Sequence, residues 1–142
     1  MKAALVGNPN AGKTSVFNLL TGLNQKVGNY PGITVDKKWG HFNYQGTDVE
    51  LLDLPGIYSI YLKSQDEEVV FQVLRQKDHR DHPDLVIVVM DATNLERNLF
   101  LATQILDLGI PTLLIANMID LMSIDQVGVN LEKLSELLGG VP

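Results

Sequence analysis

The stretch GNPNAGKTS, from Gly7 to Ser15, follows an apolar run at 3–6 and precedes a helical pattern at 14–20. Its first part, Gly7 to Thr14, matches the pattern G-x-x-x-x-G-K-[S/T]. Such a loop wraps backbone N–H groups around phosphate oxygens, and the following helix adds its N-terminal dipole. Lys13 would reach the β- and γ-phosphates, and the Thr14 hydroxyl would coordinate Mg²⁺. The sequence therefore predicts a phosphate-binding loop between a buried strand and a helix.

Short apolar runs alternate with helical patterns along the rest of the chain, which is typical of an α/β fold. The expected strands lie at 3–6, 35–44, 49–53, 85–90 and 112–116. The last two are continuous aliphatic runs, typical of parallel strands covered on both faces. We expect an open, mostly parallel sheet with helices on both faces and one antiparallel hairpin strand. Ligands bind such sheets at the carboxyl ends of the strands, where three polar loops follow, at 7–15, 53–56 and 117–120.

Two helices are predicted to begin at capping boxes, where a hydroxyl and a glutamate cap the first turn. The patterns are Ser64–Glu67 and Thr93–Glu96, and a final helix is expected at 131–138. Residues 22–33, GLNQKVGNYPGI, contain three glycines and a proline without periodicity. They predict a mobile loop.

Composition bounds the class of protein. The chain has 142 residues, 45% of them hydrophobic and 20% charged, which suits one globular domain. A net charge of −6 with scattered basic residues argues against a nucleic-acid partner. No apolar run is long enough to span a bilayer, so this segment is expected to be soluble. The absence of cysteine excludes disulfides and thiolate metal sites.

Two further motifs fit a guanine-nucleotide site. Asp53 closes a strand ahead of Gly56, and a nucleotide site needs a carboxylate that organises Mg²⁺ and a glycine whose N–H reaches the γ-phosphate. Asp120 could accept both N–H donors of a guanine edge, while Asn117 could tie its loop to the phosphate loop. Each motif alone could be an ordinary strand exit; the three in this order favour GTP.

These motifs resemble the GTPase superfamily. The sequence around and between them resembles the cytosolic G domain of bacterial ferrous iron transporters, the FeoB family, from about residue 3 to 138. The stretches that carry this resemblance include VGNYPGITVDKK, DLPGIYS and DATNLERNLFLATQILDLGIP. The resemblance implies a Ras-like P-loop NTPase fold, with Thr34 as the switch threonine and Mg²⁺ ligand. It also implies two segments that the γ-phosphate orders, switch I at 22–35 and switch II at 53–64.

The resemblance further implies which residues form the site. Four are expected to act in catalysis: Asn10, Lys13, Thr34 and Gly56. Mg²⁺ is assigned to Thr14, Thr34 and, through water, Asp53. Nucleotide binding is assigned to Asn8, Asn10, Ala11, Gly12, Lys13, Thr14, Ser15, Gly32, Ile33, Thr34, Asp53, Gly56, Asn117, Met118 and Asp120.

A potassium site is a second implication of the resemblance. In that family the asparagine at the position of Asn10 is associated with K⁺, together with switch I carbonyl oxygens, here those of Gly28 and Tyr30 by position. A monovalent cation there would stabilise charge that develops between the β- and γ-phosphates. The alternative is that Asn10 only tolerates an awkward loop dihedral.

Three departures from a Ras-like pattern carry expectations. Ile57 stands where a water-orienting glutamine is expected, so hydrolysis should be slow or use backbone groups. Met118 replaces the lysine of N-K-x-D. The sequence ends at Pro142, where the resemblance implies another strand, a G5 loop and a closing helix; we expect one G domain over 1–142 that lacks them. An uncovered face there would favour a homo-oligomer.

Several alternatives remain open from the sequence. The same chemistry occurs in ribosome-assembly and RNA-modifying GTPases, and a module that senses GTP or GDP without turnover is also compatible with Ile57. The resemblance instead implies a membrane domain elsewhere in the transporter. It places this G domain at the cytoplasmic face of the bacterial inner membrane. His79 and His82 suggest a solvated turn rather than a metal site, and Trp39 a packing residue.

Overall fold

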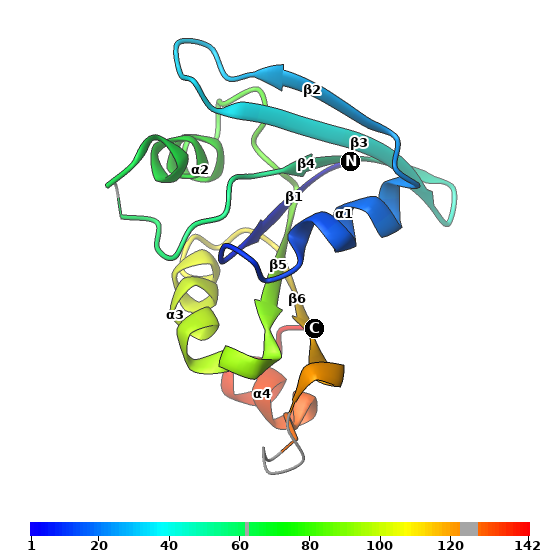
Figure 1. Ribbon diagram of the computed structural model, residues 1–142, viewed down its shortest axis with the longest axis vertical. Helices are drawn as coiled ribbons and strands as arrows, with labels where there is room; N and C mark the ends of the chain where they lie inside the picture. The colour runs from blue at the N-terminus through cyan, green and yellow to red at the C-terminus, as the bar shows by residue number, and fades with distance from the viewer. Residues whose placement is uncertain (62, 123–127) are drawn as a thin grey trace.

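A six-stranded sheet organises the chain in the computed structural model, which describes residues 1–61, 63–122 and 128–142 (Figure 1). The strand order is β2-β3-β4-β1-β5-β6. β1 pairs in parallel with β4 and β5, and β5 with β6, whereas β3 is antiparallel to both β2 and β4. The strands are β1 (Lys2–Gly7), β2 (Gln25–Asn29), β3 (Asp36–Tyr44), β4 (Thr47–Asp53), β5 (Leu85–Asp91) and β6 (Thr112–Asn117).

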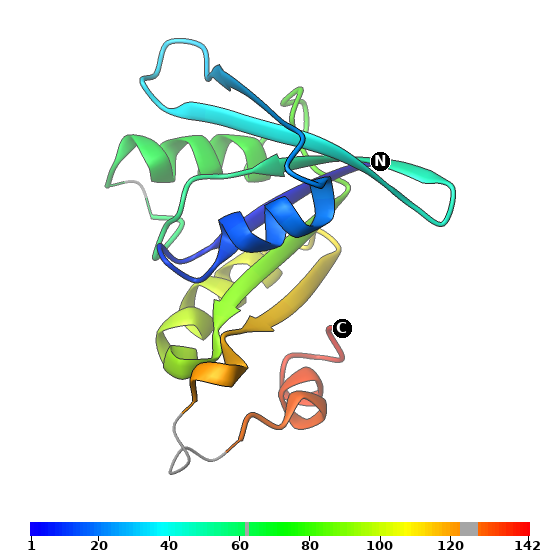
Figure 2. The ribbon, with the colours of Figure 1, turned by 45° about the vertical axis from the view of Figure 1, so that its right-hand side comes forward.

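Helices cover both faces of this sheet, as expected (Figure 2). Alternate side chains of a strand point to opposite faces, and β1 divides accordingly. Ala3 and Leu5 pack with Phe17 of α1, while Ala4 and Val6 pack with α2 and α3. The helices are α1 (Lys13–Thr21), α2 (Gln65–Arg75), α3 (Leu95–Leu106) and α4 (Leu131–Leu137), with short 3₁₀ turns η1 (Ala92–Asn94) and η2 (Ile119–Leu121). In the described residues, no helix is long and apolar enough to cross a membrane.

Switch I differs from the expected mobile loop. Its residues Gln25–Asn29 form the edge strand β2, which runs antiparallel to β3 with Gly28 opposite Lys37. The strand is exposed on both faces, so it has no alternation of apolar residues that the sequence could reveal. Pairing with β3 supplies its order instead. Leu62, within the predicted switch II, lies outside the described residues.

The serine half of one of the two predicted capping boxes is present, while the Glu67 carboxylate accepts from Lys63 N–H at 2.7 Å rather than from Ser64 N–H. The Ser64 hydroxyl accepts a hydrogen bond from Glu67 N–H at 3.3 Å and caps α2. The box predicted at Thr93 is wrong: α3 begins after Asn94, whose side chain makes no capping bond. Thr93 instead donates its N–H and hydroxyl to Asp91 at 2.8 and 2.6 Å, because Asp91 at the end of β5 is the nearer acceptor.

The α2 cap yields the first testable prediction. Ser64→Ala should lower the free energy of unfolding by about 1 kcal/mol, because Glu67 N–H loses its partner. Urea unfolding followed by circular dichroism measures this. Ser64→Asp keeps an acceptor and should retain most of the stability, so an equal loss in both variants would contradict a capping role.

Candidate nucleotide site

The phosphate loop joins β1 to α1 through two residues with left-handed backbone. Asn10 has φ 64° and Gly12 has φ 91°. Ala11 N–H donates to Asn8 O at 3.2 Å, and Val16 N–H donates to Gly12 O at 3.2 Å, so the loop turns directly into the helix. The left-handed conformation bears out the interpretation of Asn10 as a turn residue, since asparagine tolerates it better than most side chains.

Lys13 and Asp53 form an ion pair at the centre of the site. Lys13 Nζ lies 3.0 Å from Asp53 Oδ1, and the two side chains are only 12% and 10% exposed. Asp53 is the last residue of β4, and its backbone pairs in register with Leu5 of β1. The pair therefore joins the phosphate loop to the start of switch II.

Most of the predicted phosphate and metal residues line one open cleft. A cavity of about 360 Å³ is bordered by Lys13, Thr14, Thr34, Asp53 and Gly56. An adjoining cavity of about 560 Å³ shares Lys13, Thr14 and Gly56 and is bordered also by Asn8, Asn10 and Gly12. The structure thus brings together residues from β1, α1, switch I and switch II.

The third motif is tied to the phosphate loop. Asn117 Nδ2 donates to Ala11 O at 3.1 Å, the connection expected from the sequence. The Met118 methyl group lies 3.6 Å from the position that a Cβ on Gly12 would occupy, so its side chain also reaches the loop. Asp120 follows in η2 and is exposed.

Several predicted site residues lie apart from the cleft. Gly28 and Tyr30, the expected K⁺ ligands, border neither cavity; Gly28 is within β2, and Tyr30 is 4% exposed in the core. Burial raises the pKa of the Tyr30 hydroxyl well above its usual range, with Asp81 and Asp53 adding to the effect. Ile33 N–H donates to Tyr30 O at 3.3 Å in a turn next to Gly32. Ala11 and Ser15 border neither cavity.

The first turn of α2, directly after switch II, contributes residues that the sequence interpretation missed. Asp66 borders both cavities, and Gln65 Oε1 accepts a hydrogen bond from the Thr34 hydroxyl at 3.0 Å. The capping serine, Ser64, was the available signal, because a helix that starts there directs its first turn at the cleft. Ile57 is 2% exposed and donates its N–H to Gly7 O at 3.1 Å, so its side chain faces the core rather than the cleft.

The two histidines of the α2–β5 connection bond to backbone groups. His79 Nδ1 accepts from Asp81 N–H at 3.1 Å, and His82 Nδ1 lies 3.0 Å from Val73 O. Among the described residues, no cluster of three or more His, Cys, Asp or Glu could hold a metal ion. Trp39 packs against the core, and Lys37 Nζ lies 5.4 Å from its ring centroid.

Comparison with known proteins decides between the GTPase families. A family model described as Ferrous iron transport protein B matches residues 1–142. The chain belongs to this family, FeoB_N. The Fe(2+) transporter FeoB of Leptospira biflexa is 44% identical over 135 residues, which cover 95% of this chain and 19% of that protein. The FeoB_N chain thus spans about a fifth of that relative's length.

Solved structures agree with the assignment to FeoB_N. The G domain of T. maritima FeoB is 41% identical with a TM-score of 0.88, over 100% of this chain and 84% of that one. A GDP-bound mutant of the S. thermophilus FeoB G domain is 48% identical with a TM-score of 0.86, over 100% and 52%. The Ras-like fold and the resemblance seen in the motifs are therefore confirmed.

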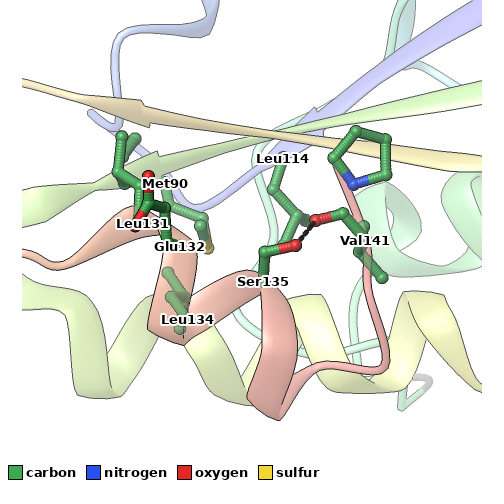
Figure 3. Close-up of a pocket in the computed structure, with 9 residues that line it drawn as sticks. Met90, Leu114, Leu131, Glu132, Leu134, Ser135 and Val141 are labelled. Atoms are coloured by element: carbon green, nitrogen blue, oxygen red, sulfur yellow. Dashed lines mark hydrogen bonds between the residues drawn. The ribbon is translucent and has the colours of Figure 1, made fainter.

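A separate apolar pocket of this FeoB_N chain lies between β6 and α4 (Figure 3). Met90, Leu114 and Leu134 border it, and two further lining residues are bonded to each other, with Ser135 Oγ donating to Val141 O at 2.6 Å. Leu114 N–H donates to Pro142 O at 2.9 Å, so residues 141–142 lie along the β6 edge. The pocket shares no lining residue with the cleft.

The contact between Gly12 and Asn117 gives a second prediction. A Cβ on Gly12 would lie 2.1 Å from Asn117 Nδ2, and φ is +91°. Gly12→Ala should therefore lower the free energy of unfolding by roughly 2–4 kcal/mol, through backbone strain and the lost Asn117 bond. Gly46→Ala is the control, since Gly46 has φ +84° but no described atom within 4 Å of its Cβ position. It should lose only about 1 kcal/mol in the same urea titration; equal losses would contradict the clash.

Proposed function

We propose that this chain binds GTP and GDP with Mg²⁺ and hydrolyses GTP slowly, as the regulatory G domain of a ferrous iron transport protein. The observation that carries the proposal is the cleft in which Lys13, Thr14 and Asp53 meet, with the Asn117 loop tied to its rim. The GDP bound to the S. thermophilus FeoB mutant supports a guanine nucleotide. In the whole protein the domain would act with a membrane domain at the cytoplasmic face of the bacterial inner membrane.

The donor set fits Mg²⁺. The Thr14, Thr34 and Asp53 side chains border one cavity, and Mg²⁺ prefers oxygen ligands from hydroxyls, carboxylates, water and phosphates. Bound there, the ion would neutralise charge on the β- and γ-phosphates. Lys13 would exchange its bond to Asp53 for phosphate oxygens, because an ammonium group binds either anion. The Gly56 backbone N–H would then bind the γ-phosphate and draw switch II toward it.

Asn10 is proposed to help hold K⁺ beside the phosphates. Its side chain borders the cleft next to Lys13 and Gly56, which puts an amide oxygen near the proposed phosphate path. K⁺ bound there would supply positive charge that arginine supplies in other GTPases. Asn10 positions that charge, while the buried Ile57 cannot orient water. Slow hydrolysis in Na⁺ follows from the missing charge and the missing glutamine.

Base selectivity is the third prediction. Asp120→Ala should weaken GTP binding roughly 10- to 100-fold and leave ATP binding unchanged, because two hydrogen bonds between a carboxylate and the base are lost. Lys13→Ala should instead weaken the binding of GTP and of ATP by similar factors. Isothermal titration calorimetry with GTP and ATP measures each affinity. Asp107→Ala, an exposed carboxylate at the end of α3, is the matched control; unchanged selectivity in Asp120→Ala would remove the base assignment.

Cation dependence is the fourth prediction. Single-turnover phosphate release should be at least about tenfold faster in KCl than in NaCl, and Asn10→Ala should abolish the difference. Asn24→Ala, an exposed asparagine before β2, should keep it. Equal rates in both salts would contradict the K⁺ role. Nucleotide binding without any phosphate release would favour a sensor that does not turn over.

A further inference from the structure

The side chain of Asn8 is buried, and neither the oxygen nor the nitrogen of its amide has a hydrogen-bond partner among the described residues. Asn8 is 4% exposed. Asn98 is equally buried, yet its Oδ1 accepts from Asp91 N–H at 3.1 Å and its Nδ2 donates to Asn94 O at 2.8 Å. A buried amide without partners destabilises the conformation that contains it, and such groups are rare in folded proteins.

Switch II rests on the two residues that flank Asn8. Gly7 O accepts from Ile57 N–H at 3.1 Å, and a Cβ on Gly56 would lie 3.1 Å from Pro9 Cα. Asn8 also borders the phosphate cleft together with Gly56. The peptide unit between Gly56 and Ile57 therefore lies against the segment that carries the unpaired amide.

The chemistry of the two groups is complementary. A primary amide offers one carbonyl acceptor and N–H donors, while a peptide unit offers one N–H and one C=O. Asn8 can therefore bond to one such peptide unit of switch II, either by Oδ1 accepting from its N–H or by Nδ2 donating to its C=O; the two groups of a trans peptide point in opposite directions, so one peptide does not take both. In the present conformation Ile57 N–H is bonded to Gly7 O, so that donor is not available to Asn8 Oδ1.

We infer that Asn8 is a positioning residue that stabilises switch II in its γ-phosphate-bound arrangement. The inference rests on the proposed function, in which Gly56 N–H moves to the γ-phosphate. That movement pulls the Gly56–Ile57 peptide off Gly7 O and presents it to the Asn8 amide. Asn8 thereby favours the triphosphate over the diphosphate, because only the γ-phosphate draws switch II into reach. Asn8 touches no reacting atom; it acts through the switch II backbone.

Asn8→Leu tests the inference because it replaces the amide with methyl groups of similar size. Without nucleotide, the variant should melt at the same temperature as the wild type or higher, since an unpaired buried amide is removed. Its affinity for the non-hydrolysable GTP analogue guanosine 5′-(β,γ-imido)triphosphate should fall about tenfold relative to GDP, in the presence of Mg²⁺. A packing role alone would change both affinities by the same factor.

Asn98→Leu is the matched control. Its amide is equally buried but paired, so the variant should lower the melting temperature by about 5 °C and leave the ratio of the two affinities unchanged. Asn8→Ala is the second variant; it leaves a void and should melt lower than Asn8→Leu, yet shift the ratio in the same direction.

The outcomes separate the inference from the function on which it rests. A ratio within about twofold of the wild type in both Asn8 variants would overturn the positioning role while leaving nucleotide binding intact. A melting temperature that falls in Asn8→Leu as far as in Asn98→Leu would also overturn it, because the amide would then be paired. A wild-type chain that binds neither nucleotide would contradict the proposed function itself, and the inference with it.

Discussion

The hydrogen bond from Asn117 Nδ2 to Ala11 O is the constraint on which the site depends. The two residues are distant in sequence, and they meet because β1, β5 and β6 are parallel neighbours whose carboxyl ends share one edge of the sheet. Gly12 leaves the space for this contact, since a Cβ there would overlap the amide. The phosphate loop and the proposed base loop are therefore one connected structure.

The parallel core of the fold is predictable from the sequence, and its edge is not. The aliphatic runs at 85–90 and 112–116 become the parallel strands β5 and β6; β5 is buried as expected for a strand covered on both faces, whereas β6, at the sheet edge, is mostly half-buried. β2 carries no such pattern, and only its partner β3 makes it a strand. The same holds for the helix caps. The Ser64 cap is local in sequence and forms as predicted, whereas Thr93 bonds to Asp91, which lies beside it at the end of β5, and caps no helix.

The residues of the candidate site are likewise predictable where they lie at the ends of regular elements, and not elsewhere. Lys13, Thr14 and Asp53 lie at ends of regular elements, so their spacing predicts their meeting. Asp66 was missed because a carboxylate in the first turn of a helix resembles an ordinary dipole partner in sequence. Gly28 and Tyr30 were assigned by their position in a family pattern and not from a local signal in the sequence. In this structure they belong to an edge strand and the core.

Switch I therefore imposes a conformational requirement on the proposed K⁺ site. Gly28 is paired with Lys37 in the β2–β3 ladder and Tyr30 is buried in the core, so the proposed approach of their carbonyl oxygens to Asn10 would work against these contacts. Any loss of strand hydrogen bonds or of apolar burial would oppose that approach. The buried Tyr30 hydroxyl, which has no hydrogen-bond partner among the described residues, would favour the approach, because water would hydrogen-bond to it once exposed. Under the proposed K⁺ role, cation binding at Asn10 would be coupled to release of switch I, and the pairing of β2 with β3 would set the cost of that release.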